Sequence, residues 1–586
     1  MSKKSTQECE DTTDPADDGD ICGLVGKVGR WHVIILAVIF INSLFNSFGQ
    51  LSMAFMLPNV NYTCARSKES LEFGMSQPAW AKATQHDFPE LASKMGGHCF
   101  RRNLDFNLET RFDEASREEI VKCDSWDFDK SVHRATIVEQ WQLMCDNDYL
   151  RPFPQAVAMA GLIVGNVLVS HFSDRFGRRL SVLCGICLCA IAGLTATTAT
   201  SFIVFNAGRF LSSISKIGIN AAIVIFLETT DASNRWMFSM LSGCGYHLGM
   251  LLLSVTAYHA RSWRVLQAVI AAPCVTILPF LYFVRESPRW LLSKKRTDDG
   301  IDVIKRIAKI NGVPQAEIDA RIPAIRSRYS GLRDSNHKSA IDLFRASGGK
   351  ENMSANTLIM WYLCFSFGLL FYSSIFISTS LGTHPHISFV IPVVGELFAV
   401  VLVACGVRFL KRRLIVCVTG LLGGIGFLLL GFTDQIFSDH SFRVVLRMGS
   451  VILIRSSSAA FTQLYPVYSA ELYQTPLRNM GIGFCDLMFR LASTVDPFGR
   501  YWLPRIHERL LPVLYAFLGF TAALLSLRLP ETLNKDLEDG VFSRLSAGVE
   551  RIRRSLRKRA SIFSIGSTET GDLKKKTSSP TEQLRL

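Results

Sequence analysis

Long apolar runs dominate this sequence and limit what it can fold into. Twelve runs of about 20 residues can be marked, at 31–57, 153–172, 180–199, 202–227, 236–258, 264–284, 357–379, 387–407, 413–433, 444–468, 480–499 and 510–529. A helix of about 20 apolar residues spans the ~30 Å hydrocarbon core of a bilayer. Only 19 % of the residues are charged, whereas soluble domains average roughly 25 %. The runs therefore predict an all-α membrane protein with twelve transmembrane helices.

Basic residues gather in segments that we expect on one side of the membrane. Segment 285–354 holds 15 Lys and Arg, and segment 530–586 holds 12. Lys and Arg mark the cytosolic side of membrane proteins, so both termini are predicted to be cytosolic. The net charge of +14 then reflects topology, and no nucleic-acid partner is expected. The cluster Arg551–Arg559 is either a solvated basic tail or a contact with anionic inner-leaflet lipid.

Segment 58–150 is predicted to form a large extracellular loop. It carries 16 acidic and 11 basic residues, and its cysteines are Cys64, Cys99, Cys123 and Cys145. Four cysteines in an exposed loop predict two disulfides, with three connectivities left open. Asn61-Tyr-Thr is a glycosylation acceptor on the same side.

These features divide the chain into consecutive segments. The first apolar run follows an acidic stretch and is longer than a signal-peptide core, so a retained helix is predicted there. The expected segments are an acidic cytosolic N-terminus (1–30), the first helix (31–57), the disulfide-bonded and glycosylated loop (58–150), helices 2–6 of an N-terminal bundle (151–284), a basic cytosolic linker (285–354), a C-terminal six-helix bundle (355–530) and a basic, Ser-rich cytosolic tail (531–586).

The two halves repeat short charged motifs in the same order. Glu228 and Arg235 follow the fourth run, and Glu471 and Arg478 follow the tenth at the same mutual spacing. Arg175-Phe-Gly-Arg-Arg179 follows the second run, and a similar basic motif at 408–413 follows the eighth. Glu-containing motifs likewise close the sixth and twelfth runs. A duplicated six-helix unit is therefore predicted, and parallel repeats with a binding site at their interface are typical of transporters.

The charged residues of these motifs lie at the predicted cytosolic helix ends. They either anchor the positive-inside topology alone or form ion pairs that bridge the halves while a cavity faces outward. Several weak pairs suffice to bias an equilibrium of a few kcal/mol. The second interpretation assigns a gating role to Asp174, Arg175, Gly177, Arg178, Arg179, Glu228, Arg235, Glu286, Arg289, Glu471 and Arg478.

Run 480–499 carries three charges, Asp486, Arg490 and Asp496. A charge near the centre of a spanning helix costs roughly 2.5–3.5 kcal/mol, so such residues face other helices or a water-filled cavity and mark candidate sites. Asp486 and Arg490 are four residues apart and share a helix face. They either pair with each other, or Arg490 faces the cavity and binds a carboxylate or sulfonate bidentately.

Further charged residues within the runs are candidates for the same cavity. Arg455 is expected to neutralise Asp486, which would leave Arg490 available to a substrate. Glu396 either contacts a cation, carries a proton or has a structural role.

Polar and aromatic residues of the first and seventh runs complete the candidate set. Asn42, Asn46 and Gln50 share one helical face and suit either a cavity wall or interhelical hydrogen bonds. Phe371 and Tyr372 either pack against neighbouring helices or stack on flat or quaternary substrates.

The motif Ser173-Asp-Arg-Phe-Gly-Arg-Arg179 resembles the loop between helices 2 and 3 of the major facilitator superfamily, although Ser170 stands where that family has Gly. Other motifs narrow the resemblance: Thr136-Ile-Val138, Cys145-Asp-Asn147, Glu286-Ser-Pro-Arg-Trp-Leu291, Asp342-Leu-Phe344, Glu471-Leu-Tyr-Gln-Thr475 and Pro530-Glu-Thr-Leu-Asn534. Over residues 30–535 the chain resembles the organic ion transporter family of polyspecific cation, carnitine and anion carriers.

The resemblance implies a major facilitator fold of two six-helix bundles that alternate access across the plasma membrane. It implies a secondary carrier for small organic ions. Arg490 falls where anion and carnitine-type carriers have Arg, which favours an anionic or zwitterionic substrate. Val400 stands where anion carriers often have Lys, whereas Lys216 and Glu396 resemble the cation branch. An organic cation or carnitine-like carrier is therefore the alternative.

Enzyme chemistry is not expected from this sequence. It contains no G-x-x-x-x-G-K-[ST] phosphate loop and no H-E-x-x-H, so neither direct ATP drive nor a metal or other cofactor is predicted. A non-transporting receptor or scaffold on the same fold is the remaining alternative from another functional class.

Overall fold

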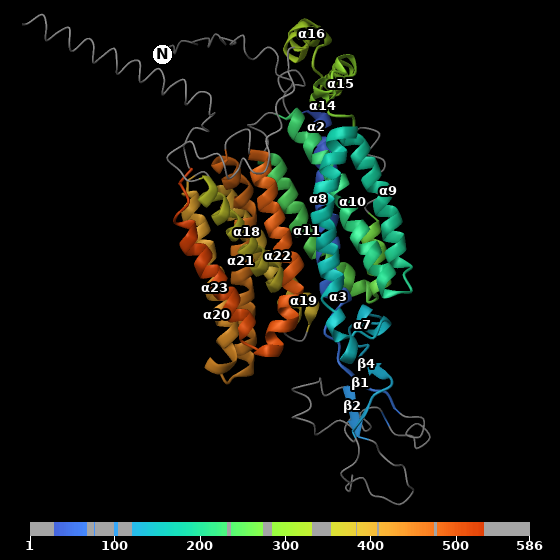
Figure 1. Cartoon of the computed structure of the whole chain (residues 1–586), viewed down its shortest axis with the longest axis vertical. Coiled ribbons are helices and arrows are strands. Elements are labelled where there is room, and N and C mark those ends of the chain that lie inside the picture. The colour runs from blue at the N-terminus through green and yellow to red at the C-terminus, as the bar shows by residue number, and fades with distance from the viewer. Residues whose placement is uncertain are drawn as a thin grey trace, which may run out of the picture.

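Two bundles of long helices stand side by side in the molecule (Figure 1). The computed structural model describes residues 29–66, 76, 99–102, 120–230, 236–272, 284–330, 353–381, 384–406, 409–473 and 478–532. The first bundle contains α2 (Arg30–Leu51) continued by α3 (Met53–Met56), α8 (Phe153–Phe176), α9 (Arg178–Thr197), α10 (Phe202–Thr229), α11 (Trp236–Ala260) and α12 (Trp263–Ala271). The second contains α18 (Met353–Thr379), α19 (Pro385–Gly406), α20 (Arg412–Ile436), α21 (His440–Leu472), α22 (Arg478–Ile506) and α23 (Leu510–Ser526).

The prediction of twelve spans is confirmed, because the described part of each apolar run lies mainly in one of these helices or, for the first run, in α2 and α3. Eight helical segments within the described residues are long and apolar enough to cross a membrane by those measures alone. Their exposed apolar side chains, such as Ile191 and Leu194 on α9, form the surface that faces lipid.

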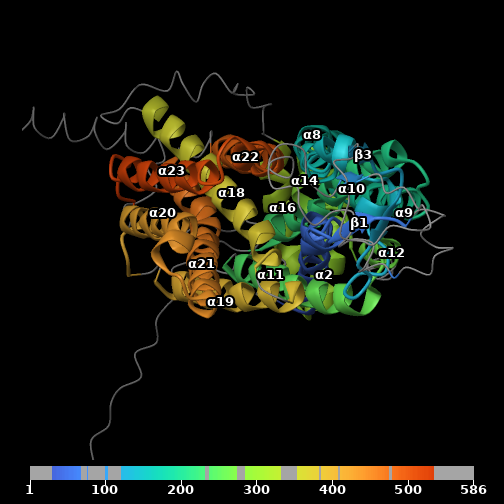
Figure 2. The same cartoon turned by 90° about the horizontal axis from the view of Figure 1, so that it is seen from below.

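The contacts between the bundles repeat across a pseudo-twofold axis. Within the first bundle α10 packs on α8 and α9, and α11 packs on α2; within the second, α21 packs on α19 and α20, and α22 packs on α18. The bundles meet where α8 contacts α22 and where α11 contacts α19 (Figure 2). These are the second and fifth helices of one half against the fifth and second of the other. This exchange is the geometry that a parallel duplication predicts.

The turn between α8 and α9 depends on a glycine. Gly177 ends α8 with φ 109° and ψ 158°, a conformation that essentially only glycine adopts. A Cβ at this position would lie 2.4 Å from Glu286 Oε2. The motif therefore needs Gly177 both for its backbone angle and for the close approach of the Glu286 carboxylate.

The segment between α3 and α8 forms a small disulfide-bonded loop domain at one end of the bundles, called the loop end below (Figure 1). Strand β1 (Tyr62–Cys64) pairs antiparallel with β4 (Trp126–Phe128), and β2 (Phe100–Arg102) pairs antiparallel with β3 (Ile120–Lys122). Short α7 (Ile137–Gln140) and a 3-10 turn, Cys145–Leu150, lead into α8. The all-α prediction did not include these strands.

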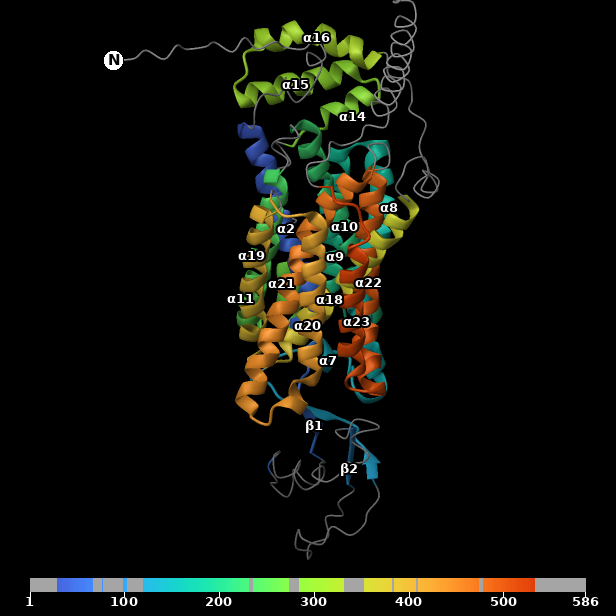
Figure 3. The same ribbon diagram turned by 90° about the vertical axis from the view of Figure 1, so that its left-hand side faces the viewer.

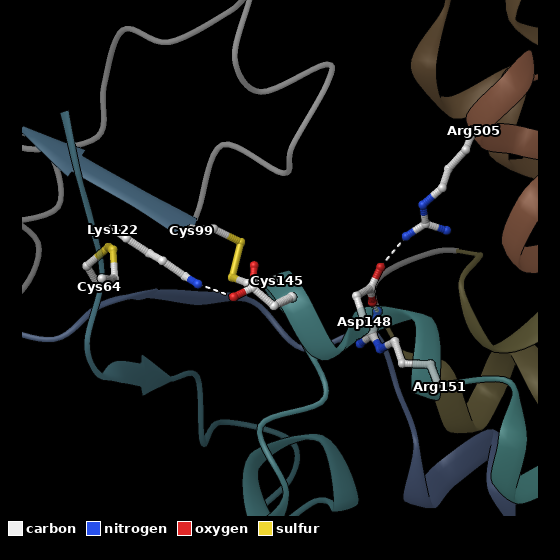
Figure 4. Close-up of a disulfide and its surroundings, with 9 residues drawn as sticks. Cys64, Cys99, Lys122, Cys145, Asp148, Arg151 and Arg505 are labelled. Atoms are coloured by element: carbon white, nitrogen blue, oxygen red, sulfur yellow. Dashed lines mark hydrogen bonds and ion pairs between the residues drawn. A yellow bond between two sulfur atoms is a disulfide. The ribbon is translucent and has the colours of Figure 1, made fainter.

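Two disulfides hold this loop, as the cysteine count predicts. The bonds are Cys64–Cys123 and Cys99–Cys145, which selects one of the three connectivities left open by the sequence (Figure 4). Cys64 and Cys123 each lie within or next to a paired strand. The covalent links therefore fix the same strands that the backbone hydrogen bonds align.

The linker between the bundles contains three helices that cross the opposite end of the molecule, called the linker end below (Figure 3). They are α14 (Pro288–Ser293), α15 (Thr297–Asn311) and α16 (Gln315–Ser330). Ser287 caps α14 by accepting a hydrogen bond from Trp290 N at 3.3 Å, and Gly312 ends α15 with φ 84°. The sequence predicted only a basic linker here, because the short polar helices lack a spanning pattern.

Candidate functional site

The charged motif of the first half folds into a compact clasp at the linker end. Arg178 Nη2 lies 3.3 Å from Glu228 Oε1 on α10 and 3.0 Å from Asp174 Oδ1 on α8. The backbone N–H of Arg178 donates to Glu286 Oε1 at 2.8 Å, and the N–H of Arg179 donates to Glu286 Oε2 at 3.1 Å. The clasp joins the cytosolic ends predicted for α8, α9 and α10 to the start of the linker.

The second half builds the same clasp from its own copy of the motifs. Arg412 Nη2 lies 3.1 Å from Glu471 Oε1, and the N–H of Arg412 donates to Glu531 Oε1 at 2.9 Å. Arg412, Glu471 and Glu531 therefore correspond to Arg178, Glu228 and Glu286 of the first clasp. The repeat inferred from three short sequence matches recurs here as a repeated hydrogen-bonding pattern.

Each clasp lies within its own bundle, so these ion pairs do not bridge the halves. Arg175 and Arg289 are exposed, and Arg178 and Glu228 are largely buried by their own bundle. Arg478 lies at the start of α22. Arg235 is outside the described residues.

The two bundles are joined at the loop end. Phe55 on α3 stacks on His386 of α19 with ring centroids 5.1 Å apart, and Phe153 on α8 contacts Phe498 of α22 at 5.4 Å. Arg505 of α22 pairs with Asp148 of the loop domain (Figure 4).

Between described residues, no hydrogen bond, ion pair or ring contact joins the bundles at the linker end. Arg412, Arg478 and Glu531 at this end have further interactions. The charge distribution predicts that the linker end is cytosolic, and the aromatic and ionic links of the loop end would then lie on the extracellular side.

The Asp486–Arg490 pair lies on α22 where that helix meets α8. Arg490 Nε donates to Asp486 Oδ2 at 2.7 Å, which is the pairing that the four-residue spacing allows. Asn166 of α8 also donates to Asp486 Oδ2, at 3.1 Å, and therefore links the first bundle to this pair. The side chains are 17 % exposed for Arg490 and 29 % for Asp486, so neither is completely enclosed by protein.

Aromatic residues surround this pair. Tyr465 stacks on Phe489 with ring centroids 6.2 Å apart, and Tyr372 lies 5.8 Å from the same ring. The Tyr465 hydroxyl donates to Asp486 Oδ1 at 3.5 Å. Phe371 also contacts Phe489, at 6.1 Å. The charged pair is thus bordered by flat π surfaces of the second bundle.

A glutamine of the first bundle receives two tyrosine hydroxyls at the bundle interface. Gln50 Oε1 accepts from Tyr372 of α18 at 3.0 Å and from Tyr246 of α11 at 3.3 Å. Gln50 Nε2 donates to Asn46 Oδ1 at 3.1 Å. The polar stripe predicted on the first run therefore reaches the second bundle at this point.

A second ion pair is fully buried, and it corrects one expectation. Arg455 Nε donates to Glu396 Oε1, and neither side chain is exposed. Arg455 also donates to the Phe389 carbonyl at 3.3 Å and lies over the Phe389 ring. Arg455 was expected to neutralise Asp486; that expectation is wrong for this conformation, because α19 supplies Glu396 directly to its guanidinium.

His247 of α11, in the first bundle, lies next to this buried pair. Its Nδ1 lies 2.7 Å from the Gly243 carbonyl, which only accepts, so Nδ1 carries the proton. Its Nε2 faces Glu396 Oε2 at 3.6 Å. Within the described residues Oε2 has no hydrogen-bond partner. The two bundles therefore approach each other at the His247 ring and the Glu396 carboxylate.

Three other polar residues lie between α2 and α10. Asn42 Nδ2 donates to Asn220 Oδ1 at 2.6 Å, which is the interhelical alternative for this residue. Arg209 donates to the Gly49 carbonyl at 2.9 Å and to Ser52 Oγ at 3.1 Å. Lys216 also lies against Gly49. These cations hold two helices of the first bundle together and are not grouped with Asp486.

The third charge of the same run is enclosed within the second bundle. Asp496 is fully buried, accepts from Arg500 Nε at 2.8 Å and accepts from the Tyr515 hydroxyl at 3.1 Å. Arg500 also lies over the Phe376 ring at 4.0 Å. This pair joins α22 to α23 and α18, and it has a structural role in this conformation.

Sequence reasoning missed the residues that reach across from the first bundle. Asn166, Tyr246 and His247 belong to no recognised motif and lie within mainly apolar runs. One feature of the sequence could have found them. A polar group is costly to place in a spanning helix, so each such residue is a candidate for burial between helices. That cost does not identify the partner.

Comparisons with known proteins agree with the fold. Residues 150–540 match the family model "Sugar (and other) transporter". The chain is 30 % identical over 426 residues to solute carrier family 22 member 7 of Sus scrofa, covering 72 % of this chain and 75 % of that protein. It is 28 % identical to solute carrier family 22 member 12 of Mus musculus, covering 73 % and 76 %. It is 26 % identical to the organic cation transporter protein of Drosophila melanogaster, covering 89 % and 93 %.

Solved structures show the same fold at lower identity. The proton:xylose symporter XylE, bound to 6-bromo-6-deoxy-D-glucose, aligns with a TM-score of 0.55 at 18 % identity, covering 87 % of this chain and 98 % of that one. The major facilitator fold implied by the motif after α8 is confirmed. The chain is therefore a multi-pass membrane protein of the sugar (and other) transporter family and, within the major facilitator superfamily, a member of solute carrier family 22.

Proposed function

We propose that this protein is a secondary carrier that moves small organic anions or zwitterions across the plasma membrane by alternating access. The observation that carries the proposal is the Asp486–Arg490 pair at the α8–α22 contact, bonded from the first bundle by Asn166. A charged pair at this contact interacts with helices of both bundles. The printed names of the relatives, solute carriers and an organic cation transporter, support transport of an organic ion.

The anion or zwitterion preference rests on exchange of partners at Arg490. Arg490 donates one N–H to Asp486, and a guanidinium has five N–H donors in a planar arrangement. A substrate carboxylate can bind the remaining N–H groups side by side. The flat faces of Tyr465 and Phe489 suit an aromatic or planar substrate body.

An organic cation is the second candidate, and one observation favours it. Asp486 is the more exposed member of the pair, at 29 % against 17 % for Arg490. A cation could then take Asp486 and use the same aromatic faces through cation–π contact. A zwitterion would engage both members of the pair.

The test is saturable uptake into proteoliposomes of three fluorescent probes, one anionic, one cationic and one zwitterionic. Two variants separate the candidates, Arg490→Gln and Asp486→Asn, each removing one charge from the same pair. In an anion carrier, Arg490→Gln should lower anion uptake at least tenfold, and Asp486→Asn should leave it unchanged. A cation carrier shows the reverse pattern, and a zwitterion carrier loses uptake in both.

The matched control is Arg447→Gln, which removes a partly exposed arginine paired with Asp434 at the loop end of the second bundle. Its uptake should equal that of the unaltered protein. The more drastic Arg490→Asp should abolish anion uptake while the protein still reaches the cell surface. Absence of saturable flux for all three probes in the unaltered protein would contradict the carrier and favour the receptor or scaffold.

A further inference from the structure

A cavity of about 640 Å³ lies at the linker end, between the turn joining α8 to α9 and the linker helices α14 and α15. Four arginines and three carboxylates are among the residues that line it. The charged groups are Arg179, Arg285, Arg296, Arg306, Glu286, Asp299 and Asp302. The cavity is separate from the Asp486–Arg490 pair.

Two of the three carboxylates are already engaged. Asp299 receives Arg296 through Nε and Nη2, each at 2.8 Å. Glu286 accepts backbone N–H groups of Arg178, Arg179 and Ser287 at 2.8–3.3 Å.

Three arginines of the cavity wall remain for a ligand. In the part of the chain that the structure describes, no carboxylate lies within ion-pair distance of the guanidinium of Arg179, Arg285 or Arg306. They come from α9, from the residue before the α14 cap region and from α15. Guanidinium groups converging from separate elements favour a multivalent anion with several acceptor oxygens, such as a phosphate ester.

Exposed apolar side chains also line the cavity. Phe176, Leu180 and Leu183 line it, with 50 %, 41 % and 44 % of their surfaces exposed. Leu180 and Leu183 continue along α9, at helical spacing, into Ile191 and Leu194, which are 63 % and 65 % exposed. This stripe belongs to the lipid-facing surface of the first bundle. The cavity is therefore open to the hydrocarbon as well as to arginines at the membrane boundary.

We propose that this cavity binds the headgroup of an acidic phospholipid. The phosphate oxygens contact Arg179, Arg285 and Arg306, and the acyl chains follow Leu183, Ile191 and Leu194 along α9. Basic pockets at the cytosolic boundary of spanning helices are suited to anionic headgroups. The shared chemistry of the ligand is a phosphate ester; the apolar stripe is what distinguishes a lipid from a soluble phosphate compound.

The position of the cavity gives the lipid a structural consequence. Arg179 is bonded through its own N–H to Glu286, the acceptor that also holds Arg178 of the first clasp. A bound headgroup would tie α15 to α9 on the outer side of that clasp. The lipid would therefore hold the linker helices on the first bundle during movements of the two halves. This inference concerns binding and holds whether or not the substrate assignment is correct.

The test is a binding titration of the purified full chain in phosphatidylcholine nanodiscs with fluorescent phosphatidylinositol bisphosphate. The variant Arg179→Gln/Arg285→Gln/Arg306→Gln should weaken binding at least tenfold. The control, Lys294→Gln/Lys295→Gln/Lys309→Gln, removes the same formal charge from exposed residues of the linker region that do not line the cavity. It should retain binding within about twofold. Should the triple arginine variant misfold, Arg285→Gln/Arg306→Gln serves in its place.

A second arm identifies the source of the phosphate. Soluble inositol bisphosphate should compete at least tenfold more weakly than the lipid, and Leu180→Asn/Leu183→Asn should reduce lipid binding without changing competition by the soluble compound. If the lysine control weakens lipid binding as much as the arginine variant does, binding depends on diffuse surface charge and the proposal is overturned. Equal affinity for the soluble compound would overturn the lipid assignment in favour of a soluble phosphate ligand.

Discussion

The buried charges of this protein differ in what they pair with, and their partners decide their roles. Arg490 pairs with the neighbouring Asp486 on its own helix and stays partly exposed. Arg455 pairs with Glu396 of another helix and is completely enclosed. A partly exposed pair can exchange a partner for a substrate, whereas an enclosed one leaves an uncompensated charge when it is broken. This distinction separates the proposed binding pair from the structural one.

The enclosed pair predicts a large loss of stability on neutralisation. Glu396→Gln should lower the free energy of unfolding by about 3 kcal/mol, because Arg455 would remain buried without a counter-charge. The measurement is the thermal unfolding midpoint of purified protein in detergent. Glu508→Gln is the control, since Glu508 is 82 % exposed. A midpoint for Glu396→Gln equal to that of the control would contradict the structural role.

Residue partners were predictable only where one helix contains both of them. The spacing of Asp486 and Arg490 predicts their pairing, because residues four apart share a helix face. The partner of Arg455 depends on how α19 and α21 are rotated against each other, and no local pattern in the sequence records that rotation. Asn166 and His247 went unnoticed for the same reason.

At the level of elements, two glycines end helices with a positive φ but differ in what lies next to them. Gly177 has φ 109° and faces the Glu286 carboxylate, whereas Gly312 ends α15 with φ 84° and faces open space, with nothing within 4 Å of the point that a Cβ would occupy. Both glycines carry a positive φ, but only Gly177 has a neighbour that a side chain would displace. A side chain is therefore expected to cost more at Gly177 than at Gly312.

Gly177→Ala should destabilise the protein more than Gly312→Ala does. The expected cost at Gly312 is about 1 kcal/mol, from the positive φ alone. At Gly177 it should reach about 3 kcal/mol, since the backbone lies in a glycine-only region and the Glu286 carboxylate must also move. Thermal unfolding of the two variants under identical conditions measures the difference. Equal midpoints would contradict this account of Gly177.

The loop domain allows a direct check of connectivity. Peptide mapping of the non-reduced protein should recover Cys64 linked to Cys123 and Cys99 linked to Cys145. Replacing Cys99 and Cys145 together by Ser should cost about 2–5 kcal/mol, the usual effect of removing a native disulfide. Recovery of Cys64 linked to Cys99 would contradict the described arrangement of strands.

Elements were predictable in proportion to their length and apolar content. Hydropathy alone located the twelve spans, because crossing a bilayer imposes a minimum length on each helix. The linker helices and the two-stranded sheets were not predicted. Their strands are three residues long, and α15 and α16 are mostly polar, so neither leaves a spanning pattern.

At the scale of the whole molecule, the two halves are joined at the loop end and carry separate clasps at the linker end. The Arg505–Asp148 pair and the Phe55–His386 stack join the halves at the loop end. The duplication explains why the second helix of each half contacts the fifth helix of the other half, α8 with α22 and α19 with α11. Movement about this interface would open one end as the other closes, with the Asp486–Arg490 pair lying on the interface itself.

The most direct test is the accessibility of position 490 from each side of the membrane. Arg490→Cys, in a background with the other free cysteines replaced by Ser, is treated with a membrane-impermeant thiol reagent from one side at a time. Ala492→Cys is the control, since Ala492 is fully buried two residues further along the same helix. Alternating access predicts labelling at 490 from both sides and none at 492. A cysteine at 490 that is sealed from both sides under every condition would contradict it.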